Sequence, residues 1–151
     1  MEIPVAALQT VELFAGLTPE QLAAIIEVGQ ATVYHKGEVI LNRGDQSTEV
    51  YVLLGGQVEV VSELSENATS YVILGAGQSF GEMALLDAGP RSAAIRCVSA
   101  EAQILALGRD TLLAFWQDHC EVAYTMLFNI ARDLAFKLRI RNLTQEMGAE
   151  R

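Results

Sequence analysis

The chain has 151 residues, of which 51% are hydrophobic and 19% charged, a balance that predicts one folded domain rather than a disordered segment. Its 10 Lys and Arg residues stand against 19 Asp and Glu, a net charge of −9. This charge argues against nucleic acid or an anionic membrane as the partner, because both require a basic face. The first residues lack the pattern of a signal peptide, and no apolar stretch reaches the ~18 residues that span a bilayer. By elimination, we expect a cytoplasmic protein that binds no membrane.

Histidine and cysteine are too few for most metal or nucleophile chemistry. There are 2 of each, His35 and His119, Cys97 and Cys120. We expect both thiols to be buried, as in a reducing compartment, and His35 to lie at the end of a strand. The sequence therefore predicts no metal site and no catalytic residue.

Two short helices are predicted before residue 31. The first covers residues 5–13 and is broken by the following glycine-containing turn. The second begins after Thr18, which suits the N-cap, with Pro19 at the first helical position and Gln21 completing a capping box. Gly29 ends it.

From residue 31 the pattern changes to short β-branched and aromatic runs separated by glycine turns. Strands are predicted at 31–35, 38–41, 49–54, 57–62, 70–74, 93–98 and 102–107, and residues 63–70 as an exposed hairpin tip. This number and spacing of strands favour a sandwich or barrel.

After residue 107 the helical period returns, with helices predicted at 111–117 and at about 121–143. The longer helix carries one near-heptad stripe (Ala123, Leu127, Ala131, Leu134, Leu138) and a second stripe (Phe128, Arg132, Phe136, Arg139). Since two apolar faces must both be buried, we expect a homodimer formed through helix 121–143; packing of both faces within the monomer is the alternative. The predicted organisation is one domain over 1–151, with N-terminal helices (1–30), a β-roll (31–108), C-terminal helices (109–143) and a tail (144–151).

Residues 80–93 form the segment with the most chemical information. Gly81 permits close approach of the backbone to a ligand, and residues 82–86 can form a short helix whose start suits an anion. Arg91 lies in an acidic region, since residues 1–118 hold 5 Lys and Arg against 15 Asp and Glu. Its fork of donors fits one phosphate, and Glu82 could accept from a sugar hydroxyl. Spacing alone allows a second interpretation equally well, in which Arg91 and Glu82 form an ion pair that holds the loop.

The run Phe80-Gly81-Glu82-Met83-Ala84-Leu85, followed by Pro90-Arg91-Ser92-Ala93, resembles the phosphate-binding cassette of cyclic-nucleotide-binding domains. Residues 37–40, 44–45, 50–53 and 56–60 match the β-roll pattern of that family in order and spacing, so that the resemblance covers roughly residues 13–142. It implies a mainly β fold with flanking helices: a double-stranded β-helix (jelly-roll-like β-roll), N-terminal helices and a long C-terminal helix.

The resemblance also implies a non-catalytic sensor that binds cAMP or cGMP and needs no cofactor. Arg91, Ser92 and the backbone amide of Ala93 would hold the phosphate, and Gly81 and Glu82 the ribose. The apolar walls would be Val72, Phe80, Met83 and Ala84, and the candidates for the lid over the base are Arg132, Phe136 and Lys137. Ser92, in place of Thr, favours cAMP over cGMP.

Three alternatives remain at this stage. The chain could be a degenerate member that keeps the fold for dimerisation or protein contacts and binds no nucleotide. It could be a cyclic-nucleotide hydrolase, although the histidines and cysteines are few for a metal centre. It could also be the sensor fragment of a longer transcription regulator. The family's transcription factors continue into a winged helix-turn-helix, for which the sequence has no room after the long helix, so we expect no DNA binding by this chain and an unidentified downstream protein.

Overall fold

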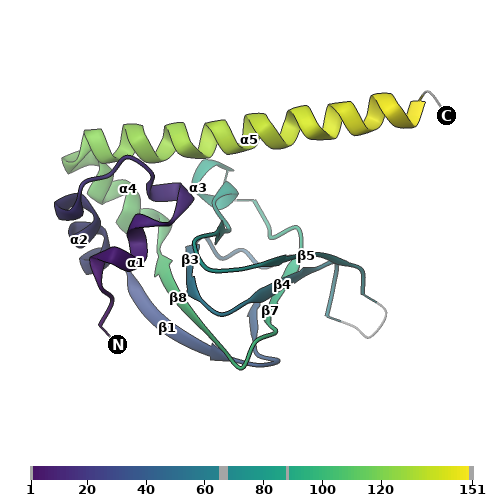
Figure 1. Ribbon diagram of the computed structural model, residues 1–151, viewed down its shortest axis with the longest axis horizontal. Coiled ribbons are helices and arrows are strands. Elements are labelled where there is room, and N and C mark those ends of the chain that lie inside the picture. Colours follow the sequence, from purple (N-terminus) through teal and green to yellow (C-terminus); the bar gives the residue numbers. More distant parts are fainter. Residues whose placement is uncertain (1, 65–67, 88, 150–151) are drawn as a thin grey trace.

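The computed structural model describes residues 2–64, 68–87 and 89–149. Within these ranges, eight strands form two antiparallel four-stranded sheets, β1-β8-β3-β6 and β2-β7-β4-β5. The strands are β1 Gln30–His35, β2 Val39–Leu41, β3 Val50–Gly55, β4 Val58–Val61, β5 Ser70–Leu74, β6 Ser79–Phe80, β7 Ala94–Cys97 and β8 Glu101–Leu107. The helices are α1 Val5–Gln9, η1 Glu12–Phe14 (a 3₁₀ turn), α2 Pro19–Val28, α3 Met83–Asp87, α4 Arg109–Asp118 and α5 Cys120–Ala149. Figure 1 shows α5 lying along one side of the β-roll and projecting beyond it.

The predicted fold class is therefore confirmed: a mainly β jelly-roll with flanking helices and a long C-terminal helix. All seven predicted strands are present, and no strand end differs from its prediction by more than one residue. Sequence analysis missed β6, which has only two residues and pairs with β3 through Tyr51↔Phe80 and Val52↔Ser79. The helix predicted over 5–13 is in fact two elements, α1 and η1.

Strand β3 divides the interior into two cores because its side chains alternate between the two faces. Val50 and Val52 join the cluster beneath the helices, whereas Tyr51 and Leu53 join the cluster inside the roll. Both faces of the strand are thus covered, which explains its uninterrupted apolar sequence. The second core is the part of the fold that supports the site described below.

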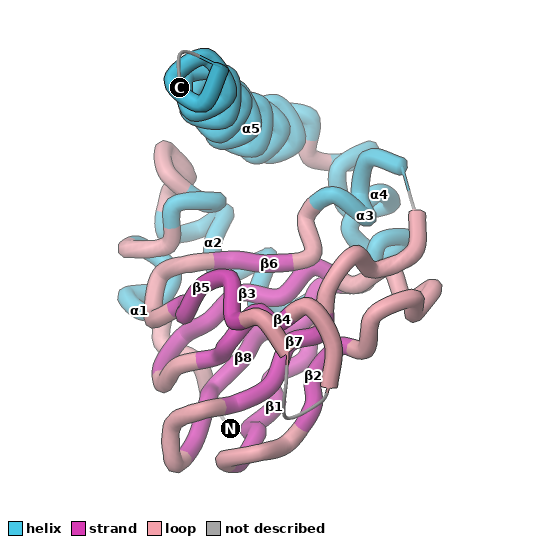
Figure 2. Tube along the Cα trace, turned by 90° about the vertical axis from the view of Figure 1, so that its right-hand side faces the viewer, coloured by secondary structure: helices cyan, strands magenta, loops and turns pink. Residues whose placement is uncertain are grey.

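Helices α1 and α2 lie together on one side of the strands (Figure 2). The predicted capping box of α2 is confirmed: the Thr18 Oγ1 accepts from the Gln21 amide at 3.2 Å, and the Gln21 Oε1 accepts from the Thr18 amide at 2.9 Å. Leu22 and Ile25 of α2 are fully buried, so the cap fixes the start of a helix that contributes to the first core.

Helix α5 differs from its prediction in length and in the face that packs. It has 30 residues, about 45 Å of helix, and includes residues 144–149, which were wrongly predicted as a tail. Its buried residues are Val122, Met126 and Ile130, one position away from the predicted near-heptad stripe. Among the described helices, none is both long and apolar enough to cross a membrane.

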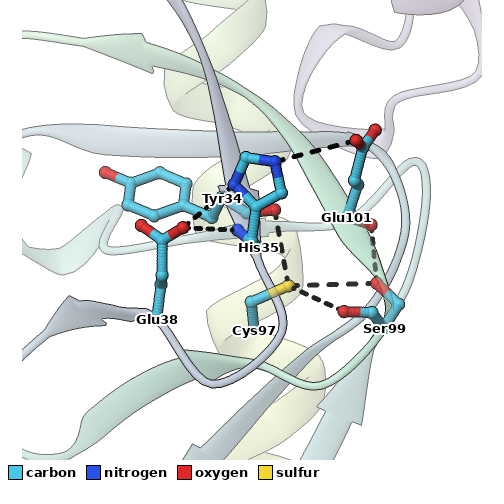
Figure 3. Close-up of polar contacts among 6 residues, drawn as sticks. All are labelled: Tyr34, His35, Glu38, Cys97, Ser99 and Glu101. Carbon is cyan, nitrogen blue, oxygen red and sulfur yellow. Dashed lines mark hydrogen bonds and ion pairs between the residues drawn. The ribbon is translucent and has the colours of Figure 1, made fainter.

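His35 and Cys97 belong to a cluster of polar contacts (Figure 3). His35 ends β1, as predicted, and its Nδ1 lies 3.0 Å from the Oε1 of Glu38. The buried Cys97 thiol donates to the backbone oxygen of Ser99 at 3.3 Å. The prediction that both thiols are buried is wrong for Cys120, which is exposed at the start of α5.

Candidate ligand site

A cavity of about 580 Å³ opens between the second sheet, the α3 segment and α5. This size lies within the range of roughly 300–1,000 Å³ that is usual for small-molecule sites. Its lining consists of strand residues (Leu41, Val60, Val72, Leu74, Ser79, Phe80, Ile95), the α3 segment (Gly81, Glu82, Met83, Ala84, Asp87), residues 89–93 and Lys137. The segment that sequence analysis singled out thus forms most of the wall.

Arg91 is fixed in this wall by its backbone. Its amide donates to the Asp45 oxygen at 2.9 Å, and its own oxygen accepts from the Gly44 amide at 2.8 Å. Gly44 has φ +88°, a conformation that glycine adopts without strain, so the turn at residues 42–45 can lie against the cassette. The contact between this turn and Arg91 was not predicted from the sequence.

The Arg91 guanidinium uses three of its five N–H groups on uncharged protein acceptors. The Nε donates to the Ser47 Oγ at 3.2 Å, the Nη1 to the Gly81 backbone oxygen at 3.3 Å, and the Nη2 to the Glu49 backbone oxygen at 2.7 Å. One N–H on each terminal nitrogen is left over. Two N–H groups of one guanidinium can bind two oxygens of one anion.

The positive charge of Arg91 is buried and has no charged partner among the described residues. The residue is 8% exposed and is the one buried charged residue among those described. No carboxylate of the described residues lies within 4.0 Å of the guanidinium. The Arg91–Glu82 ion pair that the spacing left open is therefore not formed. Since an unpaired buried charge is costly, the site favours an anionic ligand.

Glu82 provides an acceptor on the same wall. Its side chain is 13% exposed, and its Oε2 is buried with no hydrogen-bond partner among the described residues. Desolvation by burial raises the pKa of Glu82, while the charges of Lys137 and Arg91 oppose the shift. An ionised carboxylate in this position can accept a hydrogen bond from a ligand hydroxyl.

Gly81 directly precedes Glu82, and its backbone lies against the Arg91 guanidinium. It has φ +82°, and a Cβ built at this position would lie 2.8 Å from the Arg91 Nη1 and 2.9 Å from the Glu49 oxygen. Any side chain here would displace the guanidinium. The sequence predicted that the Gly81 backbone can lie close to a ligand, and in the structure this backbone lies close to the Arg91 side chain.

The apolar part of the wall is buried on one side and exposed on the other. Phe80 is 5% exposed and stacks on Tyr51 with ring centroids 5.0 Å apart. Burial, together with the hydrogen bond from its hydroxyl to Glu49, raises the pKa of Tyr51 to about 12. Ala84 is also buried, whereas Val72 and Met83 are 47% and 57% exposed.

Of the three lid candidates, α5 brings only Lys137 to the cavity. Arg132 lies over the Phe128 ring at 4.9 Å, and Phe136 is 64% exposed. Neither is among the lining residues, so any role as a lid would require α5 to move. Their predicted role stays a prediction, as do the roles of Arg91, Ser92, Ala93, Gly81 and Glu82 toward a ligand.

Ser47 and the Glu49 carbonyl are site residues that sequence reasoning missed. They precede Arg91 by 44 and 42 residues, and nothing in the polar stretch around Ser47 distinguishes its hydroxyl from those of its neighbours. Only the folding of β3 against the cassette brings them to the guanidinium.

Comparison with known proteins agrees with this geometry. Residues 31–119 match the family model of the cyclic nucleotide-binding domain. The chain is 34% identical over 136 residues, 89% of its length, to the cyclic AMP receptor protein of Thermus thermophilus. It is 31% identical over 140 residues to a cGMP-dependent protein kinase of Drosophila melanogaster, covering 91% of the chain and 18% of the kinase. The chain belongs to the cyclic-nucleotide-binding domain family.

The solved structures lead to the same fold. The crystal structure of the Thermus thermophilus catabolite activator protein superposes with a TM-score of 0.78 at 32% identity, over 90% of this chain and 62% of that one. The chain spans 61% of the length of the cyclic AMP receptor protein in sequence. The similarity therefore concerns the domain that both proteins share.

Proposed function

We propose that the protein is a cytoplasmic, non-catalytic sensor that binds a cyclic nucleotide, cAMP in preference to cGMP, with α5 as lid and output. The observation that carries the proposal is the buried Arg91, whose charge has no partner in the described protein and whose guanidinium lines the cavity. A cyclic phosphate supplies the missing negative charge and two acceptor oxygens for the two free N–H groups.

In this arrangement Ser92 and the Ala93 amide, which adjoin Arg91 in the lining, add donors to the same phosphate. Glu82 accepts from the sugar. In a 3′,5′-cyclic nucleotide the 2′-hydroxyl is the one free hydroxyl of the ribose, and the buried Oε2 of Glu82 has no donor within the described ranges of the chain. The apolar wall of Val72, Phe80, Met83 and Ala84 suits the flat faces of the sugar and base.

The preference for cAMP rests on Ser92 and on the relative named for cyclic AMP, which is similar over 89% of the chain. The relative named for cGMP makes cGMP the competing ligand. Ligand binding would act on α5 by population shift, because a ligand favours whichever position of the helix binds it better.

The proposal includes a homodimer through α5 and a downstream protein that reads the signal. Its support is the apolar surface that the helix leaves exposed: Tyr124, Phe128, Phe136, Leu138, Ile140, Leu143 and Met147, each at least half exposed. Leu138→Glu should reduce the mass measured by analytical ultracentrifugation to that of one chain. Val39→Glu, at another exposed apolar position, should leave it unchanged. A wild-type mass of one chain contradicts the dimer.

Isothermal titration with cAMP, cGMP and 5′-AMP tests the proposed ligand. We expect binding of cAMP, weaker binding of cGMP, and little binding of 5′-AMP. Absence of binding to both cyclic nucleotides would support the degenerate alternative, and conversion of cAMP to 5′-AMP on prolonged incubation would reveal a hydrolase. Either result refutes the proposed function.

A further inference from the structure

Lys137 reaches from α5 to the boundary between two cavities. The second cavity, of about 290 Å³, lies between η1, β5 and α5, and it shares Glu82 and Lys137 with the larger one. Lys137 is thus placed where a movement of α5 would change contacts with the ligand cavity.

Two carboxylates, from Asp133 and Glu82, lie near the Lys137 ammonium. Its Nζ lies 2.8 Å from the Asp133 Oδ2, one helical turn away, and 4.0 Å from the Glu82 Oε1. Burial alone would lower the pKa of Lys137, but the hydrogen bond to Asp133 and the charges of Asp133, Glu82 and Glu12 outweigh it and raise the pKa. Lys137 therefore stays charged and is oriented by Asp133 toward Glu82.

The Lys137 charge favours the ionised form of Glu82, in addition to a hydrogen bond from the Glu82 backbone amide, which lowers the pKa of this carboxyl more. Desolvation favours its protonated form, and the nearby Asp133 acts in the same direction. The opposing charges are Lys137, from α5, and Arg91, from the cassette. One oxygen of Glu82 faces Lys137, while the other is buried and receives no hydrogen bond from any residue that the structure describes. The two oxygens thus have separate surroundings, one on the helix side and one available to a ligand.

We propose that Lys137 is a positioning residue, which holds Glu82 ionised and oriented so that its second oxygen accepts the 2′-hydroxyl of the cyclic nucleotide. This inference rests on the proposed function and adds the element of α5 that acts on the sugar contact. The ammonium does not contact the ligand; it acts through Glu82. Movement of α5 then alters the strength of the ribose contact, which links the output helix to the cavity.

The test compares Lys137→Gln, Lys137→Arg and the control Arg141→Gln, which removes a positive charge from an exposed position of α5 outside both cavity linings. Each full chain is titrated calorimetrically with cAMP and with 2′-deoxy-cAMP at several pH values. We expect Lys137→Gln to weaken cAMP binding about three- to fivefold at pH 7, the range of a partly exposed ion pair. Binding of 2′-deoxy-cAMP should change less than about twofold, and Lys137→Arg should restore cAMP binding.

The pH profile supplies a second readout. Without the ammonium, the pKa of Glu82 rises further, so the loss of cAMP affinity on acidification should begin at a higher pH in Lys137→Gln than in the wild type. Equal weakening for both ligands, an unchanged profile, or the same effect from Arg141→Gln overturns the inference. Failure of the proposed function is distinguishable, because in that case the wild type binds neither ligand.

Discussion

Replacing Arg91 by glutamine removes the positive charge that we assign to the ligand phosphate. Two N–H groups of the guanidinium are free for the ligand, since the other three are bonded to Ser47, Glu49 and Gly81. Leaving a buried phosphate without its charged partner costs about 2–5 kcal/mol. This corresponds to an increase in Kd of roughly 30- to 5,000-fold for cAMP.

The matched control is Arg96→Gln. Arg96 lies on the neighbouring strand β7, pairs with the Glu59 Oε2 at 3.1 Å, and is not among the residues that line the cavity. Loss of this ion pair should change the Kd for cAMP less than about twofold. It should lower the free energy of unfolding by at most ~1 kcal/mol. Isothermal titration gives the affinities, and thermal denaturation shows that each variant is folded. A folded Arg91→Gln protein that binds cAMP within about threefold of wild type would refute the assignment of Arg91.

Three further predictions concern the support of the site and of the fold. Gly81→Ala should abolish measurable cAMP binding and lower the Tm, because a Cβ would lie 2.8 Å from the Arg91 Nη1; Gly37→Ala, with φ +88° and nothing within 4 Å, should lower only the Tm. The pKa of Tyr51 is raised from 10.0 to about 12 in the folded state. The neutral Tyr51 hydroxyl therefore stabilises the fold fully below pH 10, and this contribution is lost as the pH rises toward about 12. Between these pH values, urea denaturation should show that the free energy of unfolding of the wild type falls by up to about 2–3 kcal/mol more than that of Tyr51→Phe. Thr18→Ala should cost ~1 kcal/mol in urea denaturation and leave cAMP affinity unchanged, since the capping box lies outside the cavity; a change in affinity would contradict that separation.

Local sequence patterns were enough to predict most of the β-roll. Alternation and glycine turns give the position of a strand because the side-chain period of two is a property of the strand itself. The capping box of α2 is equally local, since its two hydrogen bonds join residues three apart. Strand β6 was not predicted because two residues are too few to show a side-chain period.

The face of α5 that packs could not be predicted, since the helix carries apolar residues on several sides. A helix buries the side that matches the surface beneath it, and that surface here is formed by η1 and the first core. Val122, Met126 and Ile130 make this contact. With α5 oriented in this way, Lys137 lies at the cavity and Phe136 is exposed.

By itself, the sequence determined the fold class, the cassette and the identity of Arg91 as the residue suited to a phosphate. Only the tertiary structure decided that, within the part of the chain that the structure describes, the charge of this arginine has no carboxylate partner and Lys137, rather than Arg91, is the cation nearest to Glu82. The reason is physical: strand periods and caps are set by residues a few positions apart. Two of the three hydrogen-bond partners of the buried Arg91 guanidinium come instead from a segment more than 40 residues earlier, which only the folded chain brings to it.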